Sequence, residues 1–389
     1  MVKHIFILGR QPTLGIAELE RLVGHDKISV FNSSVAASEH TIDKKIMLRL
    51  GGTQKIGDVL AETPMKSWPA IEEFIKTNIV PDLLSFGEGK INLGVSCYGL
   101  NIKPSQMNGS NIALKKLIKS SGRSIRIVPN NDQDLSTAQV LHNKLTGSHG
   151  FELLIVGGKK GLIFAKTSAI QDINGYASRD QIRPKRDAKI GMLPPKLAQI
   201  MINLAKPKLG SWILDPFCGT GVILQEALLM GTCAFGSDIN NTMVEYSKTN
   251  LHWLAEKFGN LPAWRVEEGD ATTKKWGLAI DSVVCETHLG KPLLRLSPMA
   301  ELMDQANYLD KLIRNFLVNL YDQISKSTEI CIAVPAWVTE KGFITLPLLD
   351  HLEKIGYNRM SFSNVDTNEL IYYRPNQLVA RQLLVLVRK

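Results

Sequence analysis

Acidic side chains that follow apolar runs are the residues of this sequence best suited to chemistry. The sharpest example is Asp215-Pro-Phe-Cys-Gly-Thr-Gly221, where an acid closes an apolar run and a glycine-rich turn leads into a helical pattern. Gly219 and Gly221 let the backbone approach a ligand closely and tolerate positive φ. Because open parallel sheets bind ligands at the carboxyl ends of their strands, we predict a ligand site at this turn.

Two more acids follow at intervals that suit a nucleoside. Asp238 ends the next apolar run, 23 residues after Asp215, a spacing typical of a carboxylate that accepts hydrogen bonds from a ribose diol. Asp270, within Gly269-Asp-Ala271, comes after a third run and suits an adenine amino group. Asp215 itself suits the cationic amino group of a methionine moiety, because a carboxylate at this turn would repel a phosphate.

Other nucleotide sites fit the turn less well. A dinucleotide site needs a third glycine in the pattern G-x-G-x-x-G, and no glycine stands at that position after Gly221. The lysine of a phosphate loop is missing as well. A glycine turn with surface acids and no ligand is the remaining alternative, and the regular order of the acids argues against it.

These acids need a parallel sheet to hold them, and the C-terminal half has the pattern for one. Apolar runs alternate with helical patterns, which is typical of a parallel sheet covered by helices. A final pair of runs, 358–365 and 377–387, has antiparallel character. The expected strands are 211–217, 233–239, 263–269, 278–286 and 329–335, and the expected helices are 195–205, 222–230, 240–258, 304–325 and 345–355.

The N-terminal half is predicted to hold two α+β modules. The first combines a strand at 4–9, a helix at 12–24 and a strand at 46–50, and Gly51-Gly52 then breaks the pattern. The second begins with helical patterns around 57–86. It continues with strands at 91–99, 124–129, 151–158 and 161–168, and with helices at 111–122 and 135–147.

Basic charge is concentrated in the second quarter of the chain. Residues 101–200 hold 16 Lys and Arg against six Asp and Glu, whereas the other residues hold 30 against 31. A concentrated basic block is typical of a protein that binds a phosphate backbone, and a solvated face is the alternative. The helix 111–122 lies in this block, and the residues expected on its apolar side are Ile112, Leu114, Leu117 and Ile118.

Composition excludes several other classes of protein. The chain has 389 residues, more than one ordinary domain, and its 44% of hydrophobic residues is too high for a disordered protein. No run approaches the ~20 apolar residues of a membrane span, and the start MVKHIFILGR lacks the features of a signal peptide. Five cysteines without a C-x-x-C pair argue against a disulfide framework and a zinc knuckle. We therefore expect a reduced cytoplasmic protein without a structural metal.

The motifs Asp215–Gly221, Ser237-Asp-Ile239 and Gly269–Ala271 together resemble those of the class I S-adenosylmethionine-dependent methyltransferases. More narrowly, the chain resembles the THUMP-domain tRNA guanine-N2-methyltransferases that act on guanosine at position 10. The resemblance covers almost the whole chain in order. Three further stretches carry it, namely IFILGRQPTLGIAELE (5–20), LGGTQKIGDVLAE (50–62) and RPKRDAKIGMLPPKLAQIMINLA (183–205).

The resemblance implies an S-adenosylmethionine site and a tRNA substrate. In that family the segment before the first strand caps the cofactor, which gives a role to Gly191-Met-Leu-Pro-Pro195. The basic second module corresponds to the THUMP domain, which grips the tRNA acceptor end. The implied cofactor-binding residues are Met192, Leu193, Pro195, Asp215, Pro216, Phe217, Cys218, Gly219, Thr220, Gly221, Asp238, Ile239, Asp270 and Ala271.

The catalytic segment departs from the family pattern. Amino-methyltransferases of this type carry Asp/Asn-Pro-Pro-Tyr/Phe after the fourth strand. The acid or amide and a backbone carbonyl accept hydrogen bonds from the target amine, and the ring stacks on the flipped base. Here the matching stretch is Cys285-Glu-Thr-His-Leu-Gly290, in which Glu286 takes the acidic position and the prolines and the ring are replaced. We expect Glu286, Thr287, His288 and Leu289 to be catalytic, with Trp337 or His288 as the substitute stacking surface.

Three readings of this departure compete. In the first, a divergent site still uses Glu286 to accept hydrogen bonds from the guanine N2 amine, whose lone pair has to point toward the methyl sulfonium. In the second, the enzyme methylates another atom or another RNA, and a methyltransferase for DNA or protein is a separate alternative. In the third, the chain is a non-catalytic RNA binder, which would have no need of three cofactor acids. We favour the first reading.

Two side chains near these motifs have simpler interpretations. His288 could act as a general base, but a lone histidine beside a pocket is more often a hydrogen-bonding bystander. Cys218 could be a nucleophile, but it lies in the cofactor turn, and a small buried cysteine is the commoner role. Cys285 is expected in the core.

These observations predict an α/β protein in four parts: an N-terminal α+β module (1–60), a THUMP-like RNA-binding domain (61–168), a basic linker (169–190) and a Rossmann-like class I methyltransferase domain (191–389). The expected partner is tRNA. We expect a monomer or weak dimer without membrane contact or metal, and the resemblance leaves room for a small activator subunit. The expected RNA-binding residues are Lys115, Lys116, Lys119, Arg123, Arg126, Lys144, Arg183, Lys185 and Arg186.

Overall fold

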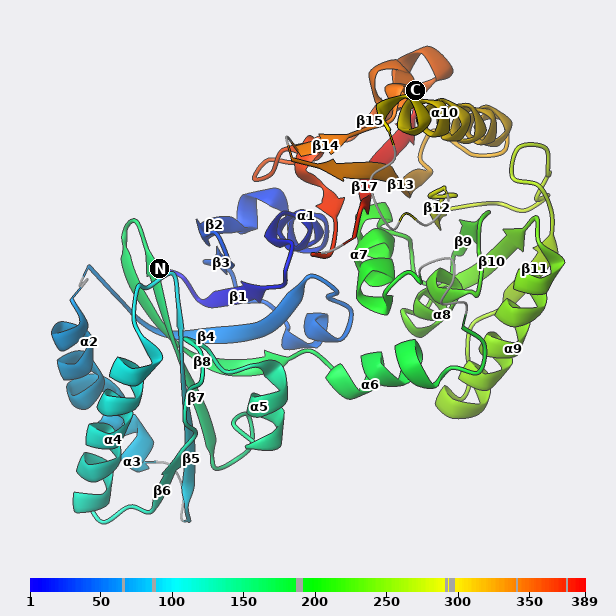
Figure 1. Ribbon diagram of the computed structural model, residues 1–389. Helices are drawn as coiled ribbons and strands as arrows, with labels where there is room; N and C mark the ends of the chain where they lie inside the picture. The colour runs from blue at the N-terminus through cyan, green and yellow to red at the C-terminus, as the bar shows by residue number, and fades with distance from the viewer. Residues whose placement is uncertain are drawn as a thin grey trace. The chain divides into compact units, whose positions relative to one another are not determined.

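The computed structural model describes residues 1–64, 67–85, 89–186, 192–290, 293, 298–340, 342–375 and 377–389. The chain divides into two units, each built on one sheet (Figure 1). Unit 1 holds Met1–Pro12, Val23–Leu48 and Gly52–Ile173. Unit 2 holds Thr13–Leu22, Arg49–Gly51 and Asn174–Lys389.

Unit 1 contains a sheet with the strand order β2-β3-β1-β4-β8-β7-β5-β6. Most neighbouring strands are antiparallel, whereas β5 runs parallel to both β6 and β7. The strands are β1 (His4–Leu8), β2 (Ser29–Asn32), β3 (Val35–Ser38), β4 (Thr53–Thr63), β5 (Ile91–Tyr98), β6 (Ile125–Ile127), β7 (Gly150–Gly158) and β8 (Gly161–Ile170).

Helices of unit 1 bury their apolar sides against this sheet. α2, α3 and α4 share one core with β5 and β7, and α5 packs in a smaller cluster that includes Val128 and Leu145. α5 begins with a capping box, in which the Ser136 hydroxyl accepts a hydrogen bond from the backbone of Gln139. The helices are α2 (Trp68–Phe74), a π-helical turn (Ile75–Ile79), α3 (Val80–Ser85), α4 (Pro104–Ser120) and α5 (Thr137–His142).

Two local predictions for unit 1 are wrong. The run 46–50 is not a strand, because most of it lies in the 3₁₀ helix Lys44–Leu48, which Asp43 caps by accepting a hydrogen bond from the backbone N–H of Lys45 at 2.9 Å. Residues 57–63 were expected within a helical pattern, but they continue β4. This strand pairs with both β1 and β8, so sheet pairing overrides the local pattern.

The apolar side of α4 is narrower than the sequence predicts. Leu114 and Ile118 are buried as expected, whereas Ile112 is 57% exposed and Leu117 is 37% exposed. The helix also begins earlier than expected, at Pro104, where a proline suits the first helical turn. A larger part of α4 therefore faces solvent together with its lysines.

Unit 2 contains the parallel sheet that the sequence predicts, with the strand order β11-β10-β9-β12-β13-β17-β15. The strands from β11 to β13 are parallel, and β17 runs antiparallel to its neighbours β13 and β15. This confirms the antiparallel closing pair, although β15 ends at Arg359, so most of the expected strand 358–365 is not a strand. The strands are β9 (Trp212–Asp215), β10 (Cys233–Asp238), β11 (Trp264–Glu268), β12 (Ser282–Glu286), β13 (Glu329–Thr339), β14 (Gly342–Ile344), β15 (Tyr357–Arg359), β16 (Ile371–Tyr372) and β17 (Val379–Arg388).

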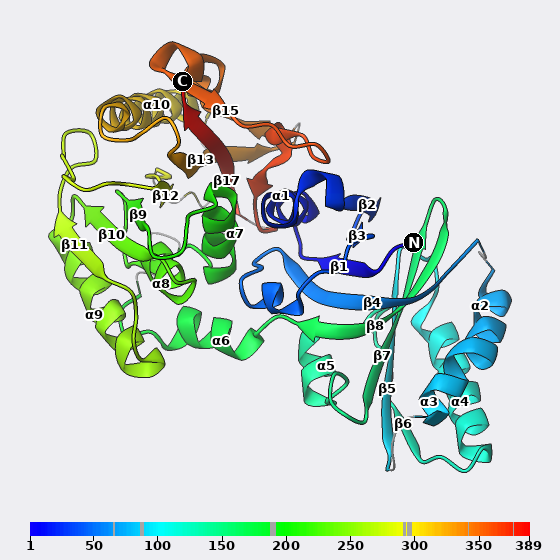
Figure 2. The ribbon, with the colours of Figure 1, turned by 180° about the vertical axis from the view of Figure 1, so that it is seen from behind.

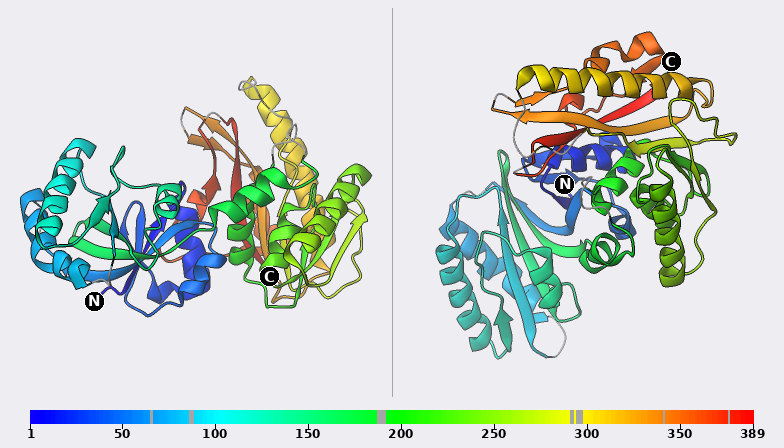
Figure 3. Two further views of the ribbon diagram at one scale, coloured as in Figure 1. Left: turned by 90° about the horizontal axis from the view of Figure 1, so that it is seen from below. Right: turned by 45° about the vertical axis from the view of Figure 1, so that its right-hand side comes forward.

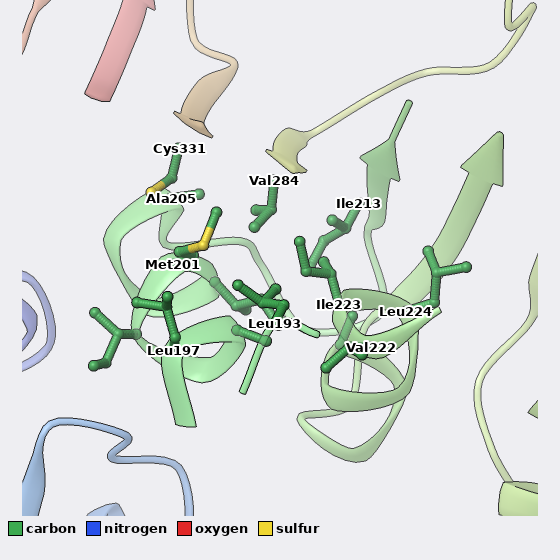
Figure 4. Packing of buried hydrophobic residues seen from close by; sticks show 14 of the residues in the cluster. Leu193, Leu197, Met201, Ala205, Ile213, Val222, Ile223, Leu224, Val284 and Cys331 are labelled. Carbon is green, nitrogen blue, oxygen red and sulfur yellow. The ribbon is translucent and has the colours of Figure 1, made fainter. Parts of the chain in front are cut away.

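Helices cover both faces of this second sheet. α7, α8 and α9 form one core with the sheet (Figure 2), and Figure 4 shows Met201 of α7 and Ile223 of α8 on this side of the sheet, below Val284 of β12. α10 lies along the other face (Figure 3), where it shares a second core with the 3₁₀ helix Pro347–Ile355. The helices are α7 (Pro195–Ala205), α8 (Val222–Leu229), α9 (Asn241–Phe258) and α10 (Met299–Tyr321).

The first helix, α1 (Pro12–Val23), falls largely in unit 2, although β1 and β2 beside it in sequence belong to unit 1. Glu18 on α1 accepts a hydrogen bond from Asn203 Nδ2 at 2.7 Å. Glu20 accepts hydrogen bonds from the backbone N–H groups of 363 and 364. The buried carboxylates of α1 therefore fix it within unit 2, where an unpaired buried acid would be costly.

The predicted linker 169–190 contains regular structure where it is described. α6 (Ile173–Ala177) and a π-helical turn (Ser178–Ile182) follow β8, whereas residues 187–190 lie outside the described residues. The boundaries predicted at 60, 168 and 190 stay predictions. β4 continues through residue 60, so the strands on both sides of that boundary share one sheet. Within the described residues, no helix is both long and apolar enough to cross a bilayer.

Candidate cofactor and substrate site

A cavity of about 440 Å³ opens in unit 2 where the parallel strands end. β9, β10 and β12 contribute residues at or just after their carboxyl ends, and α10 contributes two further side chains. A cavity of this size suits one small organic molecule. Its lining residues are Met192, Leu193, Asp215, Pro216, Phe217, Cys218, Gly219, Thr220, Val222, Ile223, Asp238, Ile239, Asn240, Met243, Gly269, Asp270, Ala271, Glu286, Thr287, His288, Leu289, Gly290, Tyr308 and Leu312.

The structure brings together nearly all residues that the sequence predicts for the cofactor. The exceptions are Pro195, which begins α7, and Gly221, which directly precedes α8. The four residues predicted to be catalytic, 286–289, line the same cavity. Gly191 of the predicted capping segment lies outside the described residues. The functional roles of these residues stay predictions.

The glycine-rich turn is built by backbone conformations that other residues rarely adopt. Gly219 has φ of 49° and Gly221 has φ of 81°. A Cβ atom at Gly221 would lie 2.8 Å from Oγ of Ser247 on α9, so the turn also needs glycine for space. The Ser247 hydroxyl donates a hydrogen bond to the carbonyl of Gly219 at 2.8 Å. Packing between α9 and the turn therefore fixes the backbone that a ligand would approach.

Asp215, at the end of β9, is a buried carboxyl that lines the cavity. Its side chain is 1% exposed, and Oδ1 accepts a hydrogen bond from the backbone N–H of Phe217 at 3.2 Å. Burial raises the pKa of Asp215 well above its ordinary value, and the negative charges of Asp238 and Glu286 raise it further. A positively charged ligand group in the cavity would lower this pKa again, because it favours the ionised carboxylate.

Asp238 and Asp270 are held by their own loops. Asp238 accepts hydrogen bonds from the backbone N–H groups of Gly219 and Asn240, both at 2.9 Å. Asp270 accepts from the backbone and the hydroxyl of Thr272 through its Oδ1 atom, both at 2.8 Å. Each carboxylate is oriented by the chain beside it and keeps further lone pairs for hydroxyl or amino groups of a ligand.

The cysteines near the site are part of the packing. Cys218 is 5% exposed and Cys285 is fully buried, which agrees with the predicted core roles. Burial raises the pKa of both thiols well above the ordinary value, so neither is a ready nucleophile. Over the described part of the chain, no cluster of three or more His, Cys, Asp or Glu has the arrangement of a metal site.

Glu286, at the end of β12, makes an ion pair with Arg381 of β17. Arg381 is 5% exposed, so the pair is largely shielded from water. Burial raises the pKa of Glu286, and the positive charge and hydrogen bond of Arg381 act in the opposite direction. Sequence reasoning missed Arg381, because nothing near it in the chain marks it as a partner for Glu286.

The three residues after Glu286 differ in what their side chains do. Thr287 is buried, and its hydroxyl donates a hydrogen bond to the carbonyl of Ala333 at 3.0 Å. His288 is exposed at the cavity. Gly290 has φ of 87°, and a Cβ atom there would lie 2.4 Å from Nε2 of Gln305 on α10. The predicted catalytic segment therefore lies directly against α10.

Trp337 cannot serve as the predicted stacking surface. β13 continues to Thr339, where the sequence suggested an end near Pro335, and the longer strand carries Trp337 into the core with no exposed surface. α10 instead brings Tyr308 and Leu312 to the cavity. Sequence reasoning missed both residues, because they lie within a helix without a recognisable motif.

Most residues predicted to bind RNA lie at the surface. On α4, Lys116 and Lys119 are exposed, and Lys115 is half-buried. The remaining exposed members are Arg126, Lys144, Lys185 and Arg186, and Arg123 is half-buried.

Arg183 differs from the other basic residues, and its prediction needs correction. Its side chain is 2% exposed, so it offers no surface to RNA. Nη2 instead approaches the sulfur of Met192, which lines the cavity, at 3.2 Å. The following residues return to the surface, and the backbone of Lys185 is bonded to Asn250 of α9.

Two family models match the sequence of this chain. Residues 183–337 match the RMKL-like methyltransferase domain. Residues 104–249 match a DNA methylase model, and the overlap of the two matches includes the glycine-rich turn and Asp238. Both matches are to enzymes that transfer methyl groups.

Curated relatives match parts of the chain. The tRNA (guanine(10)-N2)-dimethyltransferase of Methanothermobacter thermautotrophicus is 34% identical over 154 residues, which are 40% of this chain and 42% of that protein. The protein of the same name from Pyrococcus abyssi is 45% identical over 83 residues, which are 21% of this chain and 23% of that protein. The chain thus spans less than half the length of these relatives.

Solved structures share the fold over the full chain. TrmN from Thermus thermophilus has a TM-score of 0.58 and 13% identity, with all of both chains covered. SMU.472, a putative methyltransferase complexed with SAH, has a TM-score of 0.54 and 13% identity, with 100% of this chain and 98% of that chain covered. Residues 183–337 of this chain are therefore similar in sequence to the RMKL-like methyltransferase domain, and the chain shares a Rossmann-like methyltransferase fold with these structures.

Proposed function

We propose that the protein transfers a methyl group from S-adenosylmethionine to the N2 amine of a guanosine in tRNA, at position 10. The observation that carries the proposal is the cavity, which is lined by the buried carboxyl of Asp215 and by three further acids at or just after the ends of neighbouring strands. The names of the curated relatives support tRNA guanine as the substrate. The proposal follows the first of the three readings of the catalytic segment.

The acids of the cavity fit S-adenosylmethionine well. When bound, this cofactor supplies an electrophilic methyl group on a positively charged sulfur. Asp215 has a raised pKa and acidic neighbours, so a positive ligand group would be strongly favoured beside it. In this proposal Asp215 binds the amino group of the methionine moiety, Asp238 the ribose hydroxyls and Asp270 the adenine amino group. The Gly219 backbone gives the cofactor a close approach.

Glu286 orients the target amine in this mechanism. The lone pair of an aryl amine is delocalised into the ring, so the site has to turn it toward the methyl group. Glu286 accepts a hydrogen bond from the amine, and we assign a second acceptor to the backbone carbonyl of Thr287. The new N–C bond forms as the S–C bond breaks, and the amine proton leaves to Glu286 or water. Arg381 favours the ionised carboxylate that these steps need.

We assign RNA binding to the exposed basic side chains of unit 1 and of residues 185–186. Lys116 and Lys119 lie three residues apart on α4, so both can face one phosphate strand. Replacing both by alanine should weaken tRNA binding about equally across sequences and lower the salt slope by roughly two phosphate contacts. Binding measured at a series of salt concentrations tests this, and an unchanged slope would remove α4 from the interface.

The central experiment uses the full chain, labelled S-adenosylmethionine and unmodified tRNA transcripts. Nucleoside analysis should find N2-methylated guanosine in a transcript with guanosine at position 10. A matched transcript with adenosine at that position should receive no label. Transfer to neither transcript, nor to any other unmodified tRNA, would overturn the proposal. A product methylated on another atom would favour the second reading.

The DNA methylase match gives a specific alternative, transfer to an exocyclic amine of DNA. The chemistry of an amine oriented by Glu286 is the same, so the cavity does not separate the two substrates. The same labelled assay with duplex and single-stranded DNA at fixed salt decides between them. The predicted activator subunit, the oligomeric state and the cytoplasmic location stay predictions.

A further inference from the structure

An aromatic ring is missing from the catalytic segment, and the structure narrows down what could replace it. The segment Glu286–Gly290 contains no phenyl or phenol ring. Trp337 is fully buried. Among the described residues that line the cavity, Phe217 and Tyr308 are the two that carry such rings. Phe217 is occupied by core packing, since its ring meets that of Phe316 edge-on with 5.2 Å between centroids.

Tyr308 combines two properties that seldom occur together in an aromatic residue. Its side chain lines the cavity, yet it is 64% exposed. A large ring left in water beside a cavity is available to a ligand, because burying it against a flat apolar surface is favourable. Leu312, one helical turn further along α10, lines the same cavity and extends this apolar side.

Along α10, Tyr308 lies closer to the residues proposed to bind the target base than to those proposed to bind the cofactor's adenine. Gln305, three residues earlier, lies against Gly290 of the catalytic segment. Asn319, eleven residues later, donates a hydrogen bond to the carbonyl of Ala271 at 2.9 Å, next to the acid assigned to adenine. With a rise of about 1.5 Å per residue, Tyr308 lies about 4–5 Å along the axis from Gln305 and about 16 Å from Asn319.

We propose that Tyr308 is the surface on which the target base stacks, and that α10 thus supplies the ring that the catalytic segment lacks. The inference rests on the proposed function, because it needs a flipped base in the cavity. A base held between the ring of Tyr308 and the residues after Glu286 brings its amine to the carboxylate. Because every base has a flat π-face, Tyr308 orients the target while Glu286 selects the amine.

Matched variants of one residue test the requirement for a ring. Y308F keeps the ring, Y308L keeps apolar bulk without it, and Y308A removes both. We expect kcat/KM for tRNA to fall roughly 10-fold or more in Y308A and Y308L, and to stay within about twofold of wild type in Y308F. Affinity for S-adenosylhomocysteine should be unchanged in all three. F258A is the control, since Phe258 is an exposed aromatic residue at the end of α9, outside the cavity lining.

A binding measurement without turnover separates this inference from the proposed function. A tRNA with 2-aminopurine at position 10 should fluoresce less when bound to wild type or Y308F with S-adenosylhomocysteine than when bound to Y308L or Y308A, because a ring beneath the flipped base quenches it. Equal activity and equal quenching in all variants would overturn the role of Tyr308 while leaving the methylation proposal intact. Weaker cofactor affinity in Y308A would also overturn it, by assigning the ring to the cofactor. If the wild type quenches but methylates no tRNA, the proposed function fails and base stacking stands.

Discussion

Asp215 and Glu286 occupy equivalent places on neighbouring strands but have different partners. β9 and β12 run parallel and pair with each other, and each ends in one of these acids. Burial raises the pKa of both carboxyls. Asp215 is acted on by two further carboxyls, whereas Glu286 has the guanidinium of Arg381 beside it.

The difference teaches how one cavity can treat two reactants differently. Asp215 gains most from a ligand that brings a positive charge, which a sulfonium cofactor with an amino group does. Glu286 already has a cationic partner, so it can stay ionised and accept hydrogen bonds from a neutral amine. We infer that the charge of the protein groups beside each acid decides which reactant binds there. Asp215, among other acids, binds the cationic cofactor, and Glu286, beside Arg381, binds the neutral amine.

The largest expected effect on ligand binding follows from removing the charge of Asp215. D215N should weaken S-adenosylhomocysteine binding roughly 10- to 100-fold, because a charge-assisted hydrogen bond to the ligand amino group is lost. Isothermal titration calorimetry measures this directly. The asparagine keeps nearly the same shape, so the turn should fold as in wild type. An unchanged affinity would place the cationic group of the ligand elsewhere.

The same variant should be more stable than wild type when no ligand is bound. A carboxyl whose pKa is raised by folding loses stability as the pH rises from its unfolded pKa, about 4, toward its folded pKa. Asparagine has no such cost, so urea unfolding at neutral pH should show a higher midpoint for D215N. The gain should disappear below about pH 4, where Asp215 is protonated in both states. A lower midpoint at neutral pH would contradict the cost that we assign to this acid.

Removing the carboxylate at Glu286 should act on the chemical step. In E286A we expect kcat to fall on the order of 100-fold or more, because the amine loses the acceptor that orients it. Cofactor affinity should be largely unchanged, since Asp215 is intact. E286Q keeps one acceptor oxygen and should lose less activity. If both variants turn over at the wild-type rate, the contrast between the two acids has no role in catalysis.

The cofactor end of the cavity could be predicted from the sequence because its parts are contiguous. The apolar run of β9, the glycines of the turn and the start of α8 lie within one short segment, and Asp238 follows at a recognisable spacing. β9 and β10 follow each other along the chain and are neighbours in the sheet. Because they run parallel, their carboxyl ends meet at one edge of the sheet, which brings Asp238 beside the glycine-rich turn. One short stretch of sequence was therefore enough to predict the arrangement of most of these residues.

The substrate end could not be predicted in the same way. Arg381 is 95 residues from Glu286, and only the antiparallel insertion of β17 beside β13 brings the two together. Tyr308 lies on a helix that has a buried side and an exposed side. The sequence does not show that this exposed tyrosine faces the cavity, because that depends on how α10 packs on the sheet. Arg183 shows the opposite error, because a basic residue in a basic segment was expected at the surface and is buried.

Replacing Arg381 should have a smaller effect, which we expect in the pH dependence of kcat. Ionised Glu286 is the active form in our mechanism, so activity rises as the pH passes its pKa. Removing the positive charge in R381Q should raise that pKa and move the acid limb of the kcat profile to higher pH. R381K keeps the charge and should leave the limb near its wild-type position. Among the described residues, Asp215 of β9 and Cys285 of β12 also interact electrostatically with this carboxyl, and His288 lines the same cavity.

A fall in activity without a shift of the limb would assign Arg381 a structural role alone. Because R381Q leaves a buried acid without its partner, it is also expected to lose stability. The double variant E286Q/R381Q removes both charges and should recover much of that stability without recovering activity. Unfolding midpoints of the single and double variants therefore separate a folding defect from a change in the pKa of Glu286.

The smallest effect is expected at Thr287, which the sequence placed among the catalytic residues. Its hydroxyl is directed away from chemistry, since it donates to the carbonyl of Ala333, which also accepts from the Thr287 backbone N–H at 3.0 Å. T287V should therefore lower the free energy of unfolding by about 1 kcal/mol and leave kcat nearly unchanged. Ala333 keeps one donor in this variant, which limits the cost. A large fall in kcat at unchanged stability would show that the hydroxyl, and not only the backbone carbonyl of Thr287, takes part beside Glu286.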